Sequence, residues 1–135
     1  MNQRQLISRA RIGVTLSFLT HGFISSSFFA RIPDYKARLE LSNSVLGLCL
    51  LASSAGVLAA LGPVGRLAAQ RGSSAVLTKS SYLLVFIAPF VGISFNAISF
   101  AAILFLFGVA IAAQDVAMNT HGVTLEQKSG ARFMG

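Results

Sequence analysis

The chain has 135 residues, of which 54% are hydrophobic and only 11% are charged, and its mean hydropathy is +0.71. Soluble domains carry about 25% charged residues, so this composition excludes an ordinary soluble domain and indicates a surface that faces lipid. The net charge of +7 does not indicate nucleic-acid binding, because the basic residues cluster at the ends of apolar runs and form no basic face. We expect a lipid bilayer as partner and no nucleic acid.

Motifs for enzymatic or metal chemistry are absent from the sequence. Cys49 is the only cysteine, and the two histidines lie far apart, which excludes a disulfide framework and predicts no metal site. The chain carries no nucleophile elbow, phosphate-binding loop or zinc motif. We therefore expect no enzymatic activity and no cofactor.

Charged residues divide the chain into apolar runs that are long enough to cross a bilayer of about 30 Å. The uncharged stretch from Ser80 to Gln114 is too long for one crossing at about 1.5 Å per residue, so it must hold two helices. Gly92, Asn96 and Ser99 mark the break between them. The prediction is an all-α integral membrane fold with a cytoplasmic N-terminal segment at 1–11, a first span at 12–30, an outer loop at 31–42, a second span at 43–64, a cytoplasmic loop at 65–75, a third span at 76–95, a fourth span at 98–120, and a cytoplasmic segment at 121–135.

Two local features support these bounds. Pro33 disfavours helix at the residue before it and helps to end the first span, and Ser42 or Asn43 can cap the second helix. Strands are excluded, because lipid tolerates them only in closed barrels of alternating segments. A cleaved signal peptide is the alternative interpretation of the first run, but the run is long and no small-x-small cleavage site follows it.

The basic residues also predict the orientation of the chain. Cytoplasmic connections carry an excess of Lys and Arg. An N-terminus on the cytoplasmic side places eight of these residues inside and three outside. The inner set is Arg4, Arg9, Arg11, Arg66, Arg71, Lys79, Lys128 and Arg132, and the outer set is Arg31, Lys36 and Arg38.

Asp115 follows the long uncharged stretch and lies late in the fourth predicted span. A carboxylate within a membrane is costly unless it is protonated, paired or faces a water-filled cavity. Asn119 lies on the same helical face one turn later, and the small Gly108 and Ala112 continue that face. We interpret Asp115 and Asn119 as polar groups that face a bundle interior. The alternative is that Asp115 lies at the membrane surface and ends the span.

The first span has a polar face of its own, with Ser17, His21 and Ser25 at successive helical turns. His21 can relay protons or donate to a solute, because an imidazole titrates near neutral pH. The alternative is a neutral imidazole that hydrogen-bonds between helices.

Small residues share one face of the second span. They are Ser53, Gly56 and Ala60. Because small residues let helix backbones approach closely in membranes, we expect this face to serve helix packing and to carry no chemistry.

From the end of the second predicted span into the cytoplasmic loop the chain reads Gly62-Pro-Val-Gly-Arg-Leu-Ala-Ala-Gln-Arg-Gly. It resembles the loop between the second and third helices of major facilitator superfamily (MFS) transporters, where Gly-x-Leu-Ala-Asp-Arg-x-Gly is followed by basic residues. The matching loop positions are Gly65, Arg66 at the variable position, Leu67, Ala68 and Gly72. The charged positions differ, because Ala69, Gln70, Ser73 and Ser74 stand where the family has an acid and basic residues.

Two further segments extend the resemblance. The stretch Ala30-Arg-Ile-Pro-Asp-Tyr-Lys-Ala-Arg-Leu-Glu-Leu-Ser is similar to the first outer loop of bacterial inner-membrane members, and Ala113-Gln-Asp-Val-Ala-Met-Asn-Thr-His is similar to the fourth helix of the fucose-permease-like branch. This resemblance implies that Asp115 serves as a proton-coupling site and that Asn119 is a polar group of the central cavity.

Members of this family have twelve helices in two halves built from inverted three-helix repeats. The resemblance therefore implies that the chain supplies helices one to four, with Asp115 on the face that would meet the missing remainder. It implies proton-coupled transport of a small solute, such as a sugar, across the bacterial inner membrane by alternating access.

Two other functions fit the composition. A small four-helix multidrug exporter is less favoured, because such exporters use a carboxylate in the first helix and this first span has none. An inactive membrane-protein remnant or interaction protein is the alternative from another class, because four helices cannot enclose the cavity that twelve build.

Overall fold

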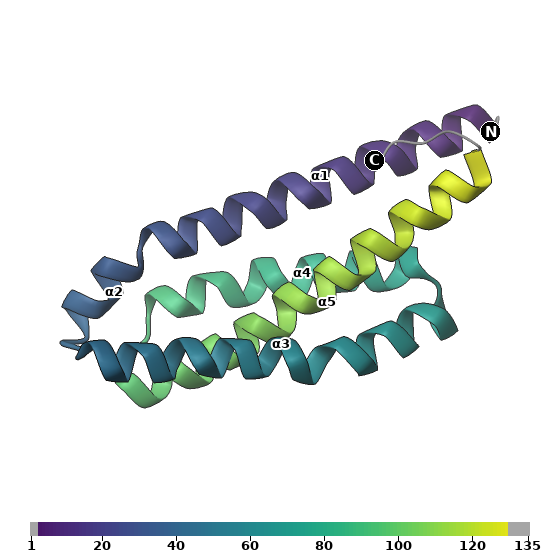
Figure 1. Ribbon diagram of the computed structural model, residues 1–135. Coiled ribbons are helices and arrows are strands. Elements are labelled where there is room, and N and C mark those ends of the chain that lie inside the picture. The colour runs from purple at the N-terminus through teal and green to yellow at the C-terminus, as the bar shows by residue number, and fades with distance from the viewer. Residues whose placement is uncertain (1–2, 130–135) are drawn as a thin grey trace.

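The computed structural model describes residues 3–129, which form five α-helices and no strand (Figure 1). Four of these helices are long and apolar enough to cross a membrane. The predicted all-α fold with four membrane-spanning helices is confirmed. The helices are α1 at Gln3–Ala30, α2 at Ile32–Arg38, α3 at Asn43–Arg71, α4 at Ser73–Gly92 and α5 at Ala97–Ser129.

Helix α5 is the centre of the bundle. It packs most extensively against α3, then against α4, and α1 lies mainly on α5. Figure 1 shows the start of α1, the α3–α4 turn and the end of α5 at one end of the bundle, with α2 and the α4–α5 turn at the other. This arrangement is the one expected of four successive crossings.

The packed face of α5 follows the helical repeat. Phe100, Leu104 and Phe107 are each at most 1% exposed, and their spacing of three and four residues places them on one side of the helix. Large apolar side chains also cover the outside of the bundle, where Phe23 is 76% and Ile98 81% exposed. Such a surface is stable in lipid tails, which are as apolar as the side chains themselves.

Helices α3 and α5 approach each other at two glycines. A Cβ atom added to Gly56 would lie 2.0 Å from the backbone oxygen of Phe105, and one added to Gly108 would lie 2.1 Å from that of Ser53. Only glycine permits this contact, because no real Cβ atom comes so close to a backbone oxygen. The small-residue face predicted for the second span is thus a packing face.

The predicted outer loop at 31–42 contains the short helix α2. Pro33 lies in its first turn, where a missing N–H costs nothing and the fixed φ favours a helix. Its Tyr35 ring is buried and lies 5.5 Å from the ring of Phe100 and 6.2 Å from that of Phe28. Ser42 then caps α3, since its Oγ accepts a hydrogen bond from the Val45 N–H at 3.2 Å.

The predicted cytoplasmic loop at 65–75 is instead helical as far as Arg71, where α3 ends. The charged residues mark where the apolar surface ends, but Arg is a good helix former and does not stop a helix. The helix ends only at Gly72, whose φ of +84° lies in the left-handed region that favours glycine. Helix α4 starts at the next residue, Ser73.

The break between α4 and α5 covers residues 93–96, inside the interval where the sequence places it. Asn96 caps α5, because its Oδ1 accepts from the Ser99 N–H at 2.7 Å and Ser99 Oγ accepts from the Asn96 N–H at 3.1 Å. Helix α5 continues past the predicted end at 120 to Ser129. The rest of the predicted 121–135 segment, residues 130–135, lies outside the described residues.

Candidate functional site

Asp115 and Asn119 lie one turn apart on α5 and are joined by hydrogen bonds. The Asn119 amide Nδ2 donates to the Asp115 carboxylate Oδ1 at 3.2 Å and to the Asp115 backbone carbonyl at 2.9 Å. Both side chains are exposed. The bonds hold the two groups together while the carboxylate stays accessible.

The pair lies on the side of α5 that no described helix covers. The neighbouring residues on the packed side of α5 are buried, namely Ala113, Gln114 and Ala117. The packed side is therefore adjacent to the Asp115–Asn119 pair around the helix and does not include it. Within residues 3–129 the pair therefore faces outward and not into a space between the described helices, and its role stays a prediction. Neighbouring residues on a helix point about 100° apart, so an acid can face outward directly beside a buried position.

His21 lies on the side of α1 that is turned toward the other helices. Its ring is half-buried, and its Nδ1 atom is buried without a hydrogen-bond partner in the part of the chain that the structure describes. One turn further on, the Ser25 hydroxyl is also buried and unpartnered among the described residues. His21 has no hydrogen bond to Asp115 or Asn119 there, so the structure does not bring these three predicted site residues together.

Gln114 is a polar residue of the bundle interior that sequence reasoning missed. It is 0% exposed, and its Nε2 donates to Ser81 Oγ of α4 at 3.1 Å and more weakly to the Ser17 carbonyl of α1 at 3.5 Å. It thus links three helices. The sequence could have indicated its burial through its spacing, because Gln114 follows Phe107 by seven residues and so lies on the same packed face of α5.

A groove opens between α1 and α4 beside this link. It has a volume of about 530 Å³, and Ser17, Thr78 and Ser81 are among its polar lining residues. His121 lies at its margin, where its Nδ1 shares a hydrogen bond of 3.0 Å with the hydroxyl of Ser73. The interior polar groups are therefore distinct from the outward-facing Asp115 and Asn119.

The Gln114–Ser81 link can be measured by a double-mutant cycle. We expect Gln114→Leu and Ser81→Ala to show a coupling energy of about 1 kcal/mol, because interhelical hydrogen bonds in membranes contribute about 0.6 to 1.7 kcal/mol. The measurement is unfolding in mixed micelles, followed by helical circular dichroism.

Ser80 gives a matched control for this cycle. It is buried beside Ser81, but its Oγ donates to the Leu77 carbonyl within α4. Ser80→Ala and Gln114→Leu should therefore be additive. Equal coupling energies for Ser80 and Ser81 would contradict the link.

The residues of the predicted loop motif lie at the end of α3. Gly65 and Leu67 are half-buried there, Arg66 is exposed, and Gly72 forms the turn into α4.

No group of three His, Cys, Asp or Glu side chains that could hold a metal gathers within residues 3–129.

Comparison with known proteins shows which proteins the chain is similar to. No protein-family model matches the chain, and no solved structure matches it. An uncharacterised MFS-type transporter of Yersinia pestis is 31% identical over 124 residues, which cover 92% of this chain and 32% of that protein. The membrane protein MosC of Rhizobium meliloti is 31% identical over 90% of the chain and 30% of its own length, and an uncharacterised transporter of Sinorhizobium fredii is 26% identical over 97% of the chain and 34% of its own length.

The chain resembles part of an MFS-type transporter. It spans about a third of the length of the curated relatives it matches. The four apolar helices and these named transporters together identify a multi-pass membrane protein related to transporters. The names do not distinguish a sugar-transporting branch from any other.

Proposed function

We propose that the chain forms the first four helices of a secondary active MFS transporter that carries a small polar solute, such as a sugar, together with protons by alternating access. The observation that carries this proposal is the exposed Asp115–Asn119 pair on a membrane-spanning helix whose residues 100–113 carry no polar side chain. An ionisable group in a span faces a cavity or a partner, because lipid does not solvate it.

The position of the pair supports a cavity shared with further helices. In transporters of this type the solute site lies near the bilayer midplane at the interface between repeats. The named relatives are about three times as long as this chain, so they have the length to supply the opposing wall. The carboxylate would bind the proton, and the Asn119 amide would hold it in place and offer a polar contact to the solute.

The remaining predictions belong to the same proposal. The excess of basic residues near the ends of the apolar runs favours a cytoplasmic N-terminus and a bacterial inner-membrane location. Arg66 and Gly72 would then lie at the cytoplasmic end, at the position of the family's loop motif. His21 is proposed as a second polar group of the proton or solute path, reached from the α1 side of the bundle.

Uptake of radiolabelled sugars tests this proposal. Bacteria that produce the complete reading frame containing this chain should accumulate one of a panel of sugars above the external concentration, and a protonophore should abolish the accumulation. The chain of 135 residues produced alone should show none. Uptake by the short chain alone, or accumulation that the protonophore leaves unchanged, would contradict the proposal.

A further inference from the structure

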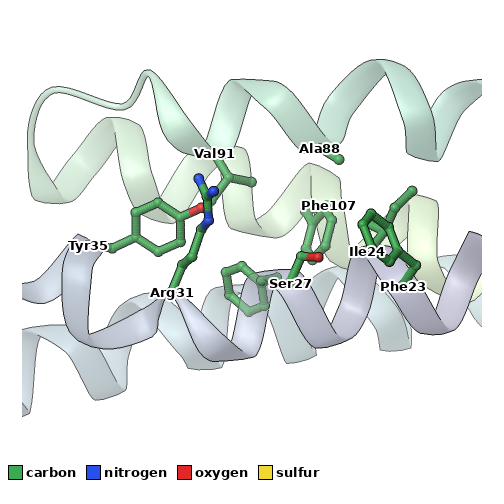
Figure 2. A pocket seen from close by; sticks show the side chains of 9 residues that line it. Phe23, Ile24, Ser27, Arg31, Tyr35, Ala88, Val91 and Phe107 are labelled. Atoms are coloured by element: carbon green, nitrogen blue, oxygen red, sulfur yellow. The ribbon is translucent and has the colours of Figure 1, made fainter.

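A partly open pocket lies at the α2 end of the bundle, between α1, α2, α4 and α5 (Figure 2). Its volume is about 170 Å³. An engineered apolar cavity of about 150 Å³ holds one benzene-sized molecule, so this pocket admits an apolar segment of about six carbons. Four aromatic rings line it, those of Phe23, Phe28, Tyr35 and Phe107.

The pocket has a polar end and an apolar end. In Figure 2 the guanidinium of Arg31 is turned toward the end formed by Tyr35 and Val91, while Phe23 and Phe107 lie toward the other end. Phe23 precedes Arg31 by eight residues, so the apolar end lies about 12 Å deeper along α1 at about 1.5 Å per residue. A ligand that fills both ends must be amphipathic.

The depth of the two ends matches the layers of a bilayer. The membrane-spanning part of α1 ends at Ala30, so Arg31 lies at the level of the lipid headgroups. Phe23, which is 76% exposed on the outside of the bundle, lies at the level of the acyl chains. The pocket therefore runs from the headgroup layer into the hydrocarbon.

Among the basic residues between the end of α1 and the start of α3, Arg31 is the one that is available to a ligand. Arg38 donates to the Gly92 carbonyl and to Ser94 Oγ, and Lys36 donates to the Asn43 side chain. The Arg31 guanidinium has no hydrogen bond or ion pair within residues 3–129, although Asp34 lies three residues away. A guanidinium at a headgroup surface favours a phosphate, which it can bind through two N–H groups.

We propose that this pocket is a binding site for an anionic phospholipid of the surrounding bilayer. The phosphate group binds Arg31 beside the Tyr35 hydroxyl, and the first carbons of one acyl chain lie among the rings of Phe28 and Phe107. The charge selects anionic headgroups, and the aromatic rings hold the chain. This site is separate from Asp115 and does not depend on transport.

A single tryptophan can report on this site, because the chain contains none. Phe107 lines the pocket but is only 1% exposed, so a Phe107→Trp side chain meets an acyl chain only if one enters. The chain is reconstituted in vesicles with phosphatidylglycerol or phosphatidylcholine that carries brominated acyl chains, and fluorescence quenching is measured. We expect a preference of about fivefold for phosphatidylglycerol, the equivalent of about 1 kcal/mol for one cation near the surface.

Two charge variants decide whether Arg31 causes the preference. Arg31→Gln should reduce the preference for phosphatidylglycerol to about onefold. Lys36→Gln also removes one positive charge at the α2 end of the bundle, but it should leave this preference unchanged. Phe29→Trp is the control for ordinary bilayer contact, because that side chain is 63% exposed and does not line the pocket, and it should show quenching without headgroup preference. If Phe107→Trp does not fold, Phe28→Trp serves as the reporter, because that side chain is 7% exposed and lines the same pocket.

Four outcomes would overturn the proposal. They are absence of quenching at the buried reporter, quenching without headgroup preference, equal loss of preference in both charge variants, and quenching by a brominated free fatty acid but by neither phospholipid. The last outcome would assign the pocket to a small amphipathic acid instead of a membrane lipid.

Discussion

Replacing Gly108 by alanine is expected to destabilise the bundle by about 2–3 kcal/mol, at the upper end of the usual cost of overpacking. The added Cβ would lie 2.1 Å from the backbone oxygen of Ser53 and 2.9 Å from its carbonyl carbon. A backbone cannot yield as the end of a flexible side chain can, so α3 and α5 must separate. Gly56→Ala should have a similar effect through its contact with the Phe105 carbonyl.

The two helices have little else to compensate for this separation. Association of helices in lipid depends on close packing and polar contacts, because lipid tails compete equally well for apolar surface. The α3–α5 contact is the most extensive in the bundle. Loss of its closest approach should therefore lower stability more than a substitution at any exposed apolar position.

Gly47→Ala on α3 is the matched control. Nothing lies within 4 Å of a Cβ built at Gly47, so the change removes only glycine's helix penalty and should stabilise the protein by up to about 1 kcal/mol. Unfolding of each variant in mixed micelles, followed by circular dichroism, gives the free energies. A Gly108→Ala protein as stable as Gly47→Ala would show that α3 and α5 are further apart than the structure has them.

The number and kind of the membrane-spanning helices could be predicted from the sequence for a physical reason, whereas the short helix α2 was not predicted. In lipid every backbone N–H and C=O must be satisfied within its own segment, so each long apolar run becomes a helix. The ends of the helices were harder to predict. Charges at Arg66 and Arg71 mark the edge of the apolar surface, but α3 stops only at Gly72, where the backbone takes a φ of +84°.

The candidate site could be predicted only in part, and α5 shows why. Residues 100–113 of this helix are apolar on all sides, so their composition does not reveal which face meets the neighbouring helices. Asp115 stands out as an acid and could be proposed as a candidate, but only the family resemblance placed it on the face that would meet further helices. Gln114 is uncharged, so it attracted no notice, although it is the residue that joins α5 to α1 and α4.

The proposed role of Asp115 leads to the largest functional effect that we expect. One proton that moves down a membrane potential of 100 mV releases about 2.3 kcal/mol, which is enough for about 50-fold accumulation of a coupled solute. Asp115→Asn keeps the size of the side chain and its neighbour Asn119 but removes the site of protonation. In the complete transporter, accumulation should therefore fall from about 50-fold to about onefold at that potential.

Exchange of labelled for unlabelled solute separates loss of coupling from loss of binding. Exchange needs no net proton movement, so Asp115→Asn should retain it while uphill accumulation disappears. Asp34→Asn, which removes an exposed acid in α2, should retain both activities.

The other possible results of the exchange and accumulation assays each have a distinct physical meaning. Loss of both activities in Asp115→Asn would indicate that the carboxylate binds the solute itself. Accumulation that stays sensitive to a protonophore would remove Asp115 from the proton path and leave His21 as the next group to replace. Because His21 is half-buried on α1 with an unpartnered Nδ1, a His21→Gln variant measured in the same two assays would then decide whether the path runs along α1.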